Sequence, residues 1–553
     1  MKPQDLIGLI KNKFGEKILE ISEPVSNQVY FTISKEAVRP LSECLFKELN
    51  ARFVISAGTD LGNTNHKEKF SVLHIFSLDQ KQMFVSLRIL LQEKDLSLDS
   101  ITPLIPAAGW AEREFKDMMG LEPLGHPDPR RLVLSDDWPE GVYPLRKDIP
   151  YDYKPPLDLT AAPKLKPPPP GSTVLPIGPF FPVLEEPVYF RVFVEGERVK
   201  GCDYRGFYNH RGVEKLGDSV LTYNQIPFLA ERICGICGFT HSVCYCQAVE
   251  AAAGIEIPWR AKFIRSLMLE LERIHNHPLW LGIAGHIIAF DTVLMQAWRI
   301  REPVMWLCER ITGNRKTYGM NLVGGVRRDV TREMFPEIQR VIDKIEKEWK
   351  EVIAAVEGDT PLLMRLKNVG FLKKESAINY AATGPTTRGS GVNIDSRRDH
   401  PYAAYERLKF KVITFEEEDI WARTLVRLFE TIESIKIVRQ CLEALEELPE
   451  GEILTEIEEE IPQGKEGISV VEAPRGEAIH YILTGEGNKP WRWRVRAPTY
   501  ANLQVIPSMI ENETIADVPI IIGSIDPCFS CTERMEIIDL KSRKVNEKIH
   551  PQI

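Results

Sequence analysis

The sequence predicts an α+β amino-terminal domain that a proline-rich linker joins to a mainly α-helical bundle domain with a small β-hairpin region. Three observations support this fold class. At 553 residues the chain is too long for one hydrophobic core. Prolines concentrate between residues 153 and 171. Apolar residues alternate before this stretch and just after it, and farther on they recur three and four apart.

Composition narrows the class of protein. Hydrophobic residues make up 43% of the chain and charged residues 27%, the proportions of a soluble globular protein. The net charge of -9 argues against a nucleic-acid-binding surface, which needs a concentrated basic face. No apolar run approaches the roughly 18 to 20 residues of a membrane span, and no signal-peptide core opens the chain. We therefore expect a cytoplasmic protein that reaches a membrane only through partners.

Residues 1–152 are expected to form the α+β domain. Alternation at residues 28–34 and 69–78 predicts two strands, and the pattern at residues 35–53 predicts a helix. The linker at residues 153–171, YKPPLDLTAAPKLKPPPPG, is expected to be extended and semi-rigid, because proline removes backbone donors and blocks helices and central strands.

Residues 172–534 are expected to form the helical domain. Alternation on both sides of Glu195 and Gly196 predicts a β-hairpin. Helical periodicity then dominates, and this predicts a helical bundle. The predicted helices cover residues 260–286, 335–358 and 414–448.

Two CxxC pairs stand near the two ends of this domain, at Cys234 and Cys237 and at Cys528 and Cys531. A CxxC turn directs two thiolates at one metal. Zinc knots usually take both pairs from within a few tens of residues, whereas these pairs are separated by most of a domain. Because thiolates suit zinc, iron-sulfur and nickel sites alike, the spacing alone leaves structural zinc and a soft transition-metal centre equally open.

The residues around the pairs carry a family resemblance. RICGICGFTHS at 232–242 and DPCFSC at 526–531 resemble the nickel-ligand motifs of nickel-iron hydrogenase large subunits. From 178 to 534 the chain resembles the family shared by group 4 energy-converting hydrogenase large subunits and the quinone-site subunit of complex I. Residues 109–150 resemble the 30-kDa subunit of complex I. This combination is similar to large subunits of the formate hydrogenlyase type.

The resemblance implies a Ni-Fe(CN)2CO centre. In it Cys234 and Cys528 are terminal nickel ligands, and Cys237 and Cys531 bridge nickel to the iron. The resemblance also makes the sulfur of Cys528 the base that takes the proton from hydrogen. The complex I relatives lack these four thiols, which favours hydrogen chemistry over quinone reduction.

Further site residues follow from the same resemblance. Glu186 in GPFFPVLEEP corresponds to the proton-relay glutamate, with Glu185 as the fallback. Read without the family, such a carboxylate is a solvated loop residue. Arg475 in EAPRGEAIHY corresponds to the arginine above the open metal position, where a fixed cation polarises bound hydrogen. Pro474 and Thr499 correspond to the pocket that holds the diatomic iron ligands.

Glu214 resembles a glutamate that binds a second divalent ion, such as Mg²⁺, in relatives. The histidine that usually follows the last CxxC in the family is Arg534 here, so an alternative is that Glu214 pairs with a cation.

Other candidate ligands are expected to lie outside the metal centre. Three histidines are expected to have structural roles. Two cysteines that form a CxC pattern just after the first CxxC pair are expected to point to different faces of a helix. These residues are His241, His275, His277, Cys244 and Cys246.

The resemblance also implies partners. Electrons are expected to leave through an iron-sulfur small subunit with a 4Fe-4S cluster, then a ferredoxin-like subunit and membrane antiporter-like subunits, with formate dehydrogenase as a further candidate. The amino-terminal domain would serve as their docking module on the cytoplasmic face of the membrane. Residues 535–553 are expected to be removed after Arg534 by a maturation protease, the alternative being an ordinary terminal strand.

Two rival functions remain open from the sequence. One is a complex I-like quinone-reducing subunit. The other is a non-catalytic assembly subunit whose thiols bind zinc.

Overall fold

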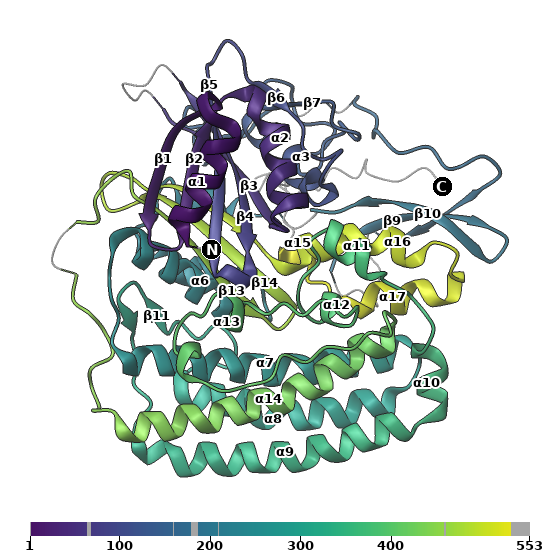
Figure 1. Ribbon diagram of the computed structural model, residues 1–553. Coiled ribbons are helices and arrows are strands. Elements are labelled where there is room, and N and C mark those ends of the chain that lie inside the picture. Colours follow the sequence, from purple (N-terminus) through teal and green to yellow (C-terminus); the bar gives the residue numbers. More distant parts are fainter. Residues whose placement is uncertain are drawn as a thin grey trace.

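The computed structural model describes residues 2–62, 68–156, 158, 160–178, 186–207, 210–457 and 460–531. The fold mixes helices and strands, and its amino-terminal domain contains a sheet, as predicted. Figure 1 shows this sheet at the top, a second sheet below it and a layer of long helices at the base. Glu185, Arg534 and residues 535–553 lie outside the described residues.

The amino-terminal sheet has five strands in the order β1-β2-β5-β4-β3. Its pairs are antiparallel except for β2 and β5, which run parallel. The predicted strands are confirmed as β2 and β4. The elements of this region are α1 (Pro3–Phe14), β1 (Ile18–Val25), β2 (Gln28–Ile33), α2 (Val38–Glu43), β3 (Arg52–Asp60), β4 (Phe70–Leu78), β5 (Met83–Leu91), β6 (Ser97–Asp99), α3 (Gly109–Met119) and β7 (Glu122–Leu124).

The helix predicted at residues 35–53 is wrong at its carboxyl end. A helical segment does follow Lys35, but it ends at Glu48 and the chain has entered β3 by Arg52. Asn50 adopts a φ of 52°, in the left-handed region that stops a right-handed helix. The apolar residues of the last predicted turn therefore belong to a strand.

The segment predicted as a linker is hydrogen-bonded to β10 (Arg198–Arg205). From 125 to 172 the described residues contain no helix or strand. Lys166 donates its backbone N–H to Asp203 at 2.9 Å, and Arg130 forms an ion pair with the same carboxylate at 3.0 Å. These contacts hold the proline-rich segment beside β10.

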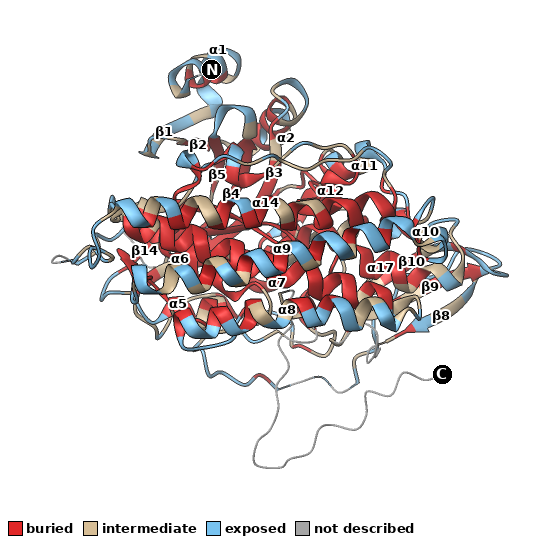
Figure 2. Ribbon diagram, turned by 90° about the horizontal axis from the view of Figure 1, so that it is seen from below, coloured by how far each residue is buried: buried red, intermediate tan, exposed pale blue. Residues whose placement is uncertain are grey.

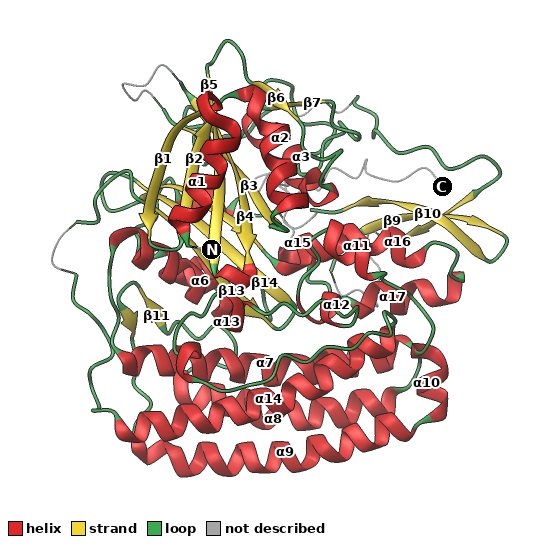
Figure 3. Cartoon of the chain, in the orientation of Figure 1, coloured by secondary structure: helices red, strands yellow, loops and turns green. Residues whose placement is uncertain are grey.

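Four long helices form the base of the molecule (Figure 3). Three confirm predicted helices: α7 (Trp259–Ile287), α9 (Phe335–Gly358) and α14 (Ile420–Glu447). The fourth, α8 (Asp291–Thr312), was not predicted. The helix predicted from residue 414 begins only at Ile420, because the Asp419 side chain accepts the N–H of Ala422 and caps the helix there. Figure 2 shows that α8 and α9 expose one side while α7 is buried along most of its length.

Shorter elements connect this layer to the sheets. The predicted hairpin is confirmed as β9 and β10, which turn at Gly196. The remaining elements are β8 (Thr173–Ile177), β9 (Tyr189–Glu195), β10 (Arg198–Arg205), α4 (Val213–Gly217), α5 (Ile226–Ala230), α6 (Gly238–Ala253), β11 (Asn321–Leu322), β12 (Gly325–Val326), α10 (Thr360–Leu366), α11 (Lys374–Asn379), α12 (Gly384–Arg388), α13 (Ser396–Asp399), α15 (Pro498–Asn502), α16 (Ile506–Ile510) and α17 (Val518–Ser524).

An antiparallel sheet lies between the amino-terminal sheet and the helices. It consists of β13 (Glu466–Ala473), β14 (Gly476–Thr484) and β15 (Pro490–Arg496) in that order. Ile468 and Ile479 share a hydrophobic core with the amino-terminal sheet, while α6 covers β13 and β14 from the other side. Both faces are therefore buried, and the strands lack the alternation of a half-exposed sheet.

None of the helices in the described part of the chain combines the length and the apolar character that crossing a membrane requires.

Candidate metal centre

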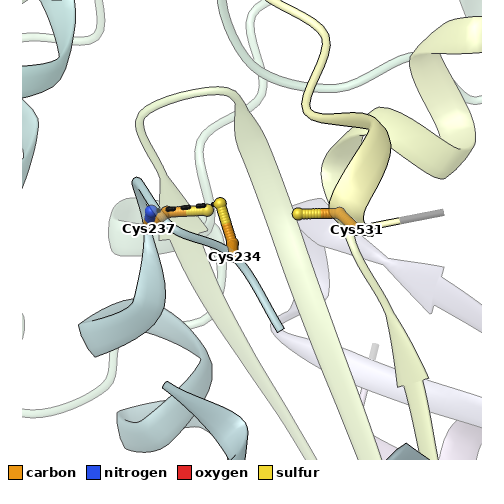
Figure 4. Close-up of side chains that lie close together, drawn as sticks. All are labelled: Cys234, Cys237 and Cys531. Atoms are coloured by element: carbon orange, nitrogen blue, oxygen red, sulfur yellow. Dashed lines mark hydrogen bonds between the residues drawn. The ribbon is translucent and has the colours of Figure 1, made fainter. Parts of the chain in front are cut away.

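Two turns from opposite ends of the second domain bring the four predicted cysteines together. Cys234 and Cys237 lie on the turn between α5 and α6, and Cys528 and Cys531 follow α17. The sulfur of Cys528 is 3.2 Å from that of Cys234 and 3.1 Å from that of Cys531. The sulfurs of Cys234, Cys237 and Cys531 all lie within 4.8 Å of one another (Figure 4). The structure thus assembles one sulfur cluster from both CxxC pairs.

Backbone amides support these sulfurs. The N–H groups of Ile236 and Cys237 donate to the sulfur of Cys234 at 3.3 and 3.2 Å. Thr499 accepts the N–H of Cys528 at 3.1 Å. Arg211 donates to the carbonyls of Ile233 and Ser530 at 2.9 and 3.2 Å, which joins the two cysteine turns.

The protonation of the cluster indicates what it can bind. Burial disfavours a thiolate at Cys234, but hydrogen bonds from the three neighbouring thiols outweigh burial and hold its pKa well below the usual value. The pKa values of the other three thiols lie well above theirs: those of Cys237 and Cys528 mainly through the bond to Cys234, and that of Cys531 mainly through burial. Hydrogen bonds thus stabilise one thiolate, and a bound cation is needed to stabilise four. An all-sulfur donor set suits a soft metal.

Arg475 lies next to the cluster at the tip of a hairpin. Pro474 and Arg475 form the two-residue turn between β13 and β14. Arg475 donates through Nε to the carbonyl of Asp526 at 2.6 Å and through Nη2 to its carboxylate at 2.7 Å. Asn276, with its amide oriented to satisfy both neighbours, accepts from Arg475 at 2.8 Å and donates to Asp526 at 3.1 Å. These partners fix the guanidinium plane.

The charge of Arg475 persists although the side chain is only 2% exposed. Burial lowers its pKa, but Asp526 and the cysteine sulfurs raise it more, so the pKa lies above the usual value. A permanent positive charge therefore faces the sulfur cluster.

Glu186 is hydrogen-bonded to the second cysteine turn. Its carboxylate accepts the backbone N–H of Ser530 at 2.9 Å and also the Ser530 hydroxyl. The pKa of Cys528 is raised mainly by its bond to Cys234 and in part by the charge of Glu186. The carboxylate therefore contacts the turn that carries Cys528 and Cys531. The fallback residue, Glu185, is not among the described residues.

Pro474 and Thr499 are buried beside the cluster. Ala473, which precedes Pro474, shares a small apolar cluster with Cys234, Cys237 and Cys528. Because the Thr499 oxygen accepts the N–H of Cys528, its own O–H remains available to donate.

Glu214 pairs with two arginines. Its carboxylate lies 2.7 Å from Arg492 and 3.0 Å from Arg494, and it accepts the N–H of Val495 at 2.9 Å. Burial raises the pKa of Glu214, but the two guanidinium charges lower it below the usual value. This geometry favours the cation-pairing alternative, while the second divalent ion stays a prediction.

Three of the remaining candidates, His241, His277 and Cys244, have hydrogen-bond partners other than the four cysteines of the cluster. His241 hydrogen-bonds to His480 at 3.1 Å and His277 to Glu430 at 3.0 Å. Cys244 donates to the carbonyl of Ser469 at 3.2 Å.

Sequence reasoning missed several supporting residues. Asp526 stands inside the quoted DPCFSC motif, so its position was a signal. Asn276 lies within a long helix far from both motifs, and no local pattern distinguishes it from a core residue. Arg211 resembles any exposed arginine until the two cysteine turns are seen together.

Comparison with known protein families matches different families to the amino-terminal region and to the rest of the chain. A family described as "Nickel-dependent hydrogenase" matches residues 211–296. The "Respiratory-chain NADH dehydrogenase, 49 Kd subunit" family matches 288–466 and 453–534, and the corresponding 30 Kd subunit family matches 31–155.

Individual relatives match nearly the whole chain. Hydrogenase-4 component G of Escherichia coli (strain K12) is 37% identical, over 98% of this chain and 94% of that protein. Formate hydrogenlyase subunit 5 of the same organism is 37% identical, over 98% of this chain and 95% of that protein. Among solved structures, a chain of the membrane-bound sulfane sulfur reductase, described as an archaeal respiratory membrane complex, superposes with a TM-score of 0.62. It is 28% identical and covers 67% of this chain and 100% of its own length.

Proposed function

The chain belongs to the group 4 nickel-iron hydrogenase large-subunit family, in the form fused to a complex I 30-kDa-like domain, and we propose that it is the catalytic large subunit of a membrane-associated hydrogenase complex. It reduces protons to hydrogen or oxidises hydrogen. The observation that carries this function is the cluster of four sulfurs from two distant CxxC turns, three of them from buried cysteines and the fourth from the partly buried Cys531. A complex I-like quinone site has no need of such a cluster.

The four cysteines would hold the metals. Cys234 and Cys528 are assigned as terminal nickel ligands, and Cys237 and Cys531 as bridges to an iron that carries cyanide and carbon monoxide. A bound Ni-Fe(CN)2CO centre would supply the Lewis acidity and redox chemistry for heterolytic cleavage of hydrogen. Pro474 and Thr499 would line the pocket for the diatomic ligands, with the Thr499 hydroxyl donating to a cyanide.

Proton transfer would begin at the sulfur of Cys528. This sulfur is 3.2 Å from that of Cys234. Glu186 would accept the proton and pass it outward. Its carboxylate accepts a hydrogen bond from the backbone N–H of Ser530, which lies in the same turn as Cys528. Arg475 would stabilise negative charge that develops at the metal site, because Asp526 and Asn276 fix its guanidinium before the reaction.

The other regions would serve assembly. Residues 1–152 would be a docking domain, 153–171 a linker to the bundle domain at 172–534, and 535–553 a tail removed on maturation by a protease. Electrons would pass to an iron-sulfur small subunit with a 4Fe-4S cluster, then to ferredoxin-like and membrane antiporter-like subunits, with formate dehydrogenase as a candidate donor. The complex would lie on the cytoplasmic face. Glu214 remains a candidate ligand for Mg²⁺ or another divalent ion.

The test combines metal analysis with an activity assay on the purified complex. We expect stoichiometric nickel together with iron, and hydrogen evolution from reduced methyl viologen. Cys531→Ala should abolish both the nickel and the activity. Cys441→Ala, which removes a buried thiol from α14, should retain them. A complex without nickel or iron would favour the quinone-reducing alternative, and zinc in the cysteine site would favour the assembly subunit.

A further inference from the structure

A lysine from outside both CxxC turns contacts the first of them. Lys316 lies between α8 and β11, and its ammonium donates to the backbone carbonyl of Ile236. The same nitrogen is 3.0 Å from Nε2 of His275 and 3.7 Å from the carboxylate of Glu272. An ammonium has three N–H donors and no acceptor, so Lys316 can donate to the carbonyl and to the imidazole together, while the carboxylate at 3.7 Å attracts it as an ion pair. The side chain is held from three directions.

Glu272 and His275 both belong to α7, and both are able to accept a hydrogen bond from a donor such as the Lys316 ammonium. Because Lys316 can only donate, Nε2 of His275 must accept, which requires a neutral ring. Burial and the charge of Lys316 hold the pKa of His275 well below its usual value, in agreement with this requirement. Glu272 also accepts the N–H groups of Phe239 and Thr240, both at 3.0 Å, in the first turn of α6. The lysine and the start of α6 are thus held by the same helix.

The carbonyl that Lys316 binds belongs to the peptide that supports a predicted metal ligand. The C=O of Ile236 and the N–H of Cys237 are the two ends of one peptide unit, and in a trans peptide they point in opposite directions. That N–H donates to the sulfur of Cys234 at 3.2 Å, the dashed line in Figure 4. A cation on the oxygen side makes the N–H a stronger donor, because hydrogen bonds in series polarise one another.

We propose that Lys316 is a positioning residue for the metal centre, which fixes and polarises the Ile236–Cys237 peptide and so strengthens its hydrogen bond to the sulfur of Cys234. This inference rests on the proposed nickel-iron function. Hydrogen bonds to ligand sulfurs withdraw electron density from them and are among the factors that set the reduction potential of a metal site. Lys316 therefore raises the midpoint potential of the centre.

The experiment uses the complete complex and first establishes that the parent contains nickel. The midpoint potential of the nickel electron paramagnetic resonance signal is then measured in Lys316→Met, which keeps the length of the side chain but loses its charge and donors. We expect a shift to more negative potential. Lys316→Arg keeps a cation and should return the potential toward the parent value. Lys347→Met removes an exposed lysine from α9 and should cause no shift.

The outcomes separate the inference from the proposed function. A parent without nickel contradicts the function itself. A nickel-containing Lys316→Met with the parent potential overturns only the role of Lys316. If Lys316→Met contains no nickel yet melts at the parent temperature while Lys316→Arg retains nickel, the charge is needed to hold the turn, as proposed. Equal loss of nickel in Lys316→Arg overturns the charge-specific role.

Discussion

Arg475 owes its orientation to partners that are themselves buried. Its Nε and Nη2 bind Asp526, and Asn276 bridges both residues. This planar set of donors cannot be reproduced by an ammonium, which is a compact charge without a fork.

Arg475→Lys should therefore lower hydrogen evolution by about 10²- to 10³-fold, the usual effect of losing one fixed electrostatic group at a reaction centre. Nickel content should stay at the parent level, because the cysteines are unchanged. Steady-state assays with reduced viologen measure the effect. Arg310→Lys on the exposed face of α8 is the matched control. Full activity in Arg475→Lys would rule out a role for the guanidinium geometry.

Glu186→Gln keeps the size of the side chain and removes its capacity to carry a proton. We expect a loss of roughly 10²- to 10⁴-fold in turnover, the range for a positioned acid-base group. Nickel should be retained. Glu197→Gln in the exposed hairpin turn serves as the control. Turnover equal to the parent would show that protons leave by another route.

At the scale of single residues, the sequence predicted the candidate site residues but not the residues that hold them in place. The CxxC spacing and the residues around it identified four thiols that do cluster. The partners of Arg475 and the contact of Lys316 with Ile236 come from segments that meet only in the folded chain, so no local pattern predicted them.

The turn between β13 and β14 sets where Arg475 lies, and it is packed tightly against α12. Gly384 adopts a φ of +68°, and a Cβ there would stand 2.4 Å from the carbonyl oxygen of Arg475. Neither backbone can yield without moving the hairpin tip.

Gly384→Ala should therefore lower both stability and activity. The left-handed backbone alone costs about 1–2 kcal/mol for a residue with a Cβ, and the contact with Arg475 adds to this. The temperature of thermal unfolding and the rate of hydrogen evolution should both fall. Gly358→Ala is the control, since a Cβ at the end of α9 meets nothing within 4 Å. Parent-like unfolding and activity in Gly384→Ala would contradict the tight packing.

Helices and strands in which apolar residues recur with one clear period could be predicted from the sequence. The apolar stripe of α9 gave its bounds directly, from Phe335 to Gly358. In α8 the period is obscured, because Ala297 and Ile300 are buried while Met295 and Trp298 are exposed. The sheet of β13 to β15 was missed because its strands are buried on both faces and do not alternate.

The amino-terminal sheet and the sheet of β13 to β15 are joined through buried ion pairs as well as apolar contacts. Arg52 at the start of β3 lies 2.8 Å from Asp79 and 2.8 Å from Glu477, which belongs to β14. Burial raises the pKa of Glu477, but Arg52 and Arg496 lower it to about 2.

Arg52→Met should destabilise the protein by roughly 3 kcal/mol, the lower end of the range for breaking a buried ion pair, because Asp79 loses its arginine while Glu477 keeps Arg496. The ordinary pKa of Glu477 is 4.5 and its folded value is about 2, so the paired carboxylate contributes stability above pH 4.5. That contribution is lost as the pH falls toward 2, and the difference between parent and variant should shrink with it. Denaturant unfolding across this pH range measures both effects.

The exposed pair between Lys13 and Glu48 provides the control for this prediction. Lys13→Met should leave the unfolding free energy unchanged, since solvent-exposed ion pairs contribute little. An equally small effect in Arg52→Met would mean that the ion pairs of Arg52 do not stabilise the contact between β3 and β14.

At the scale of the whole molecule, the sequence predicted two domains and a proline-rich segment but not how they meet. Contacts such as that of Arg52 with Glu477 join residues hundreds of positions apart, and nothing in either local sequence marks the partner.

Infrared spectroscopy of the purified complex tests the central claim most directly, because carbon monoxide and cyanide bound to iron absorb where protein does not. The account predicts bands from both ligands in the parent complex and their loss in Cys531→Ala. A parent complex without these bands, with zinc bound by the four cysteines, would contradict it.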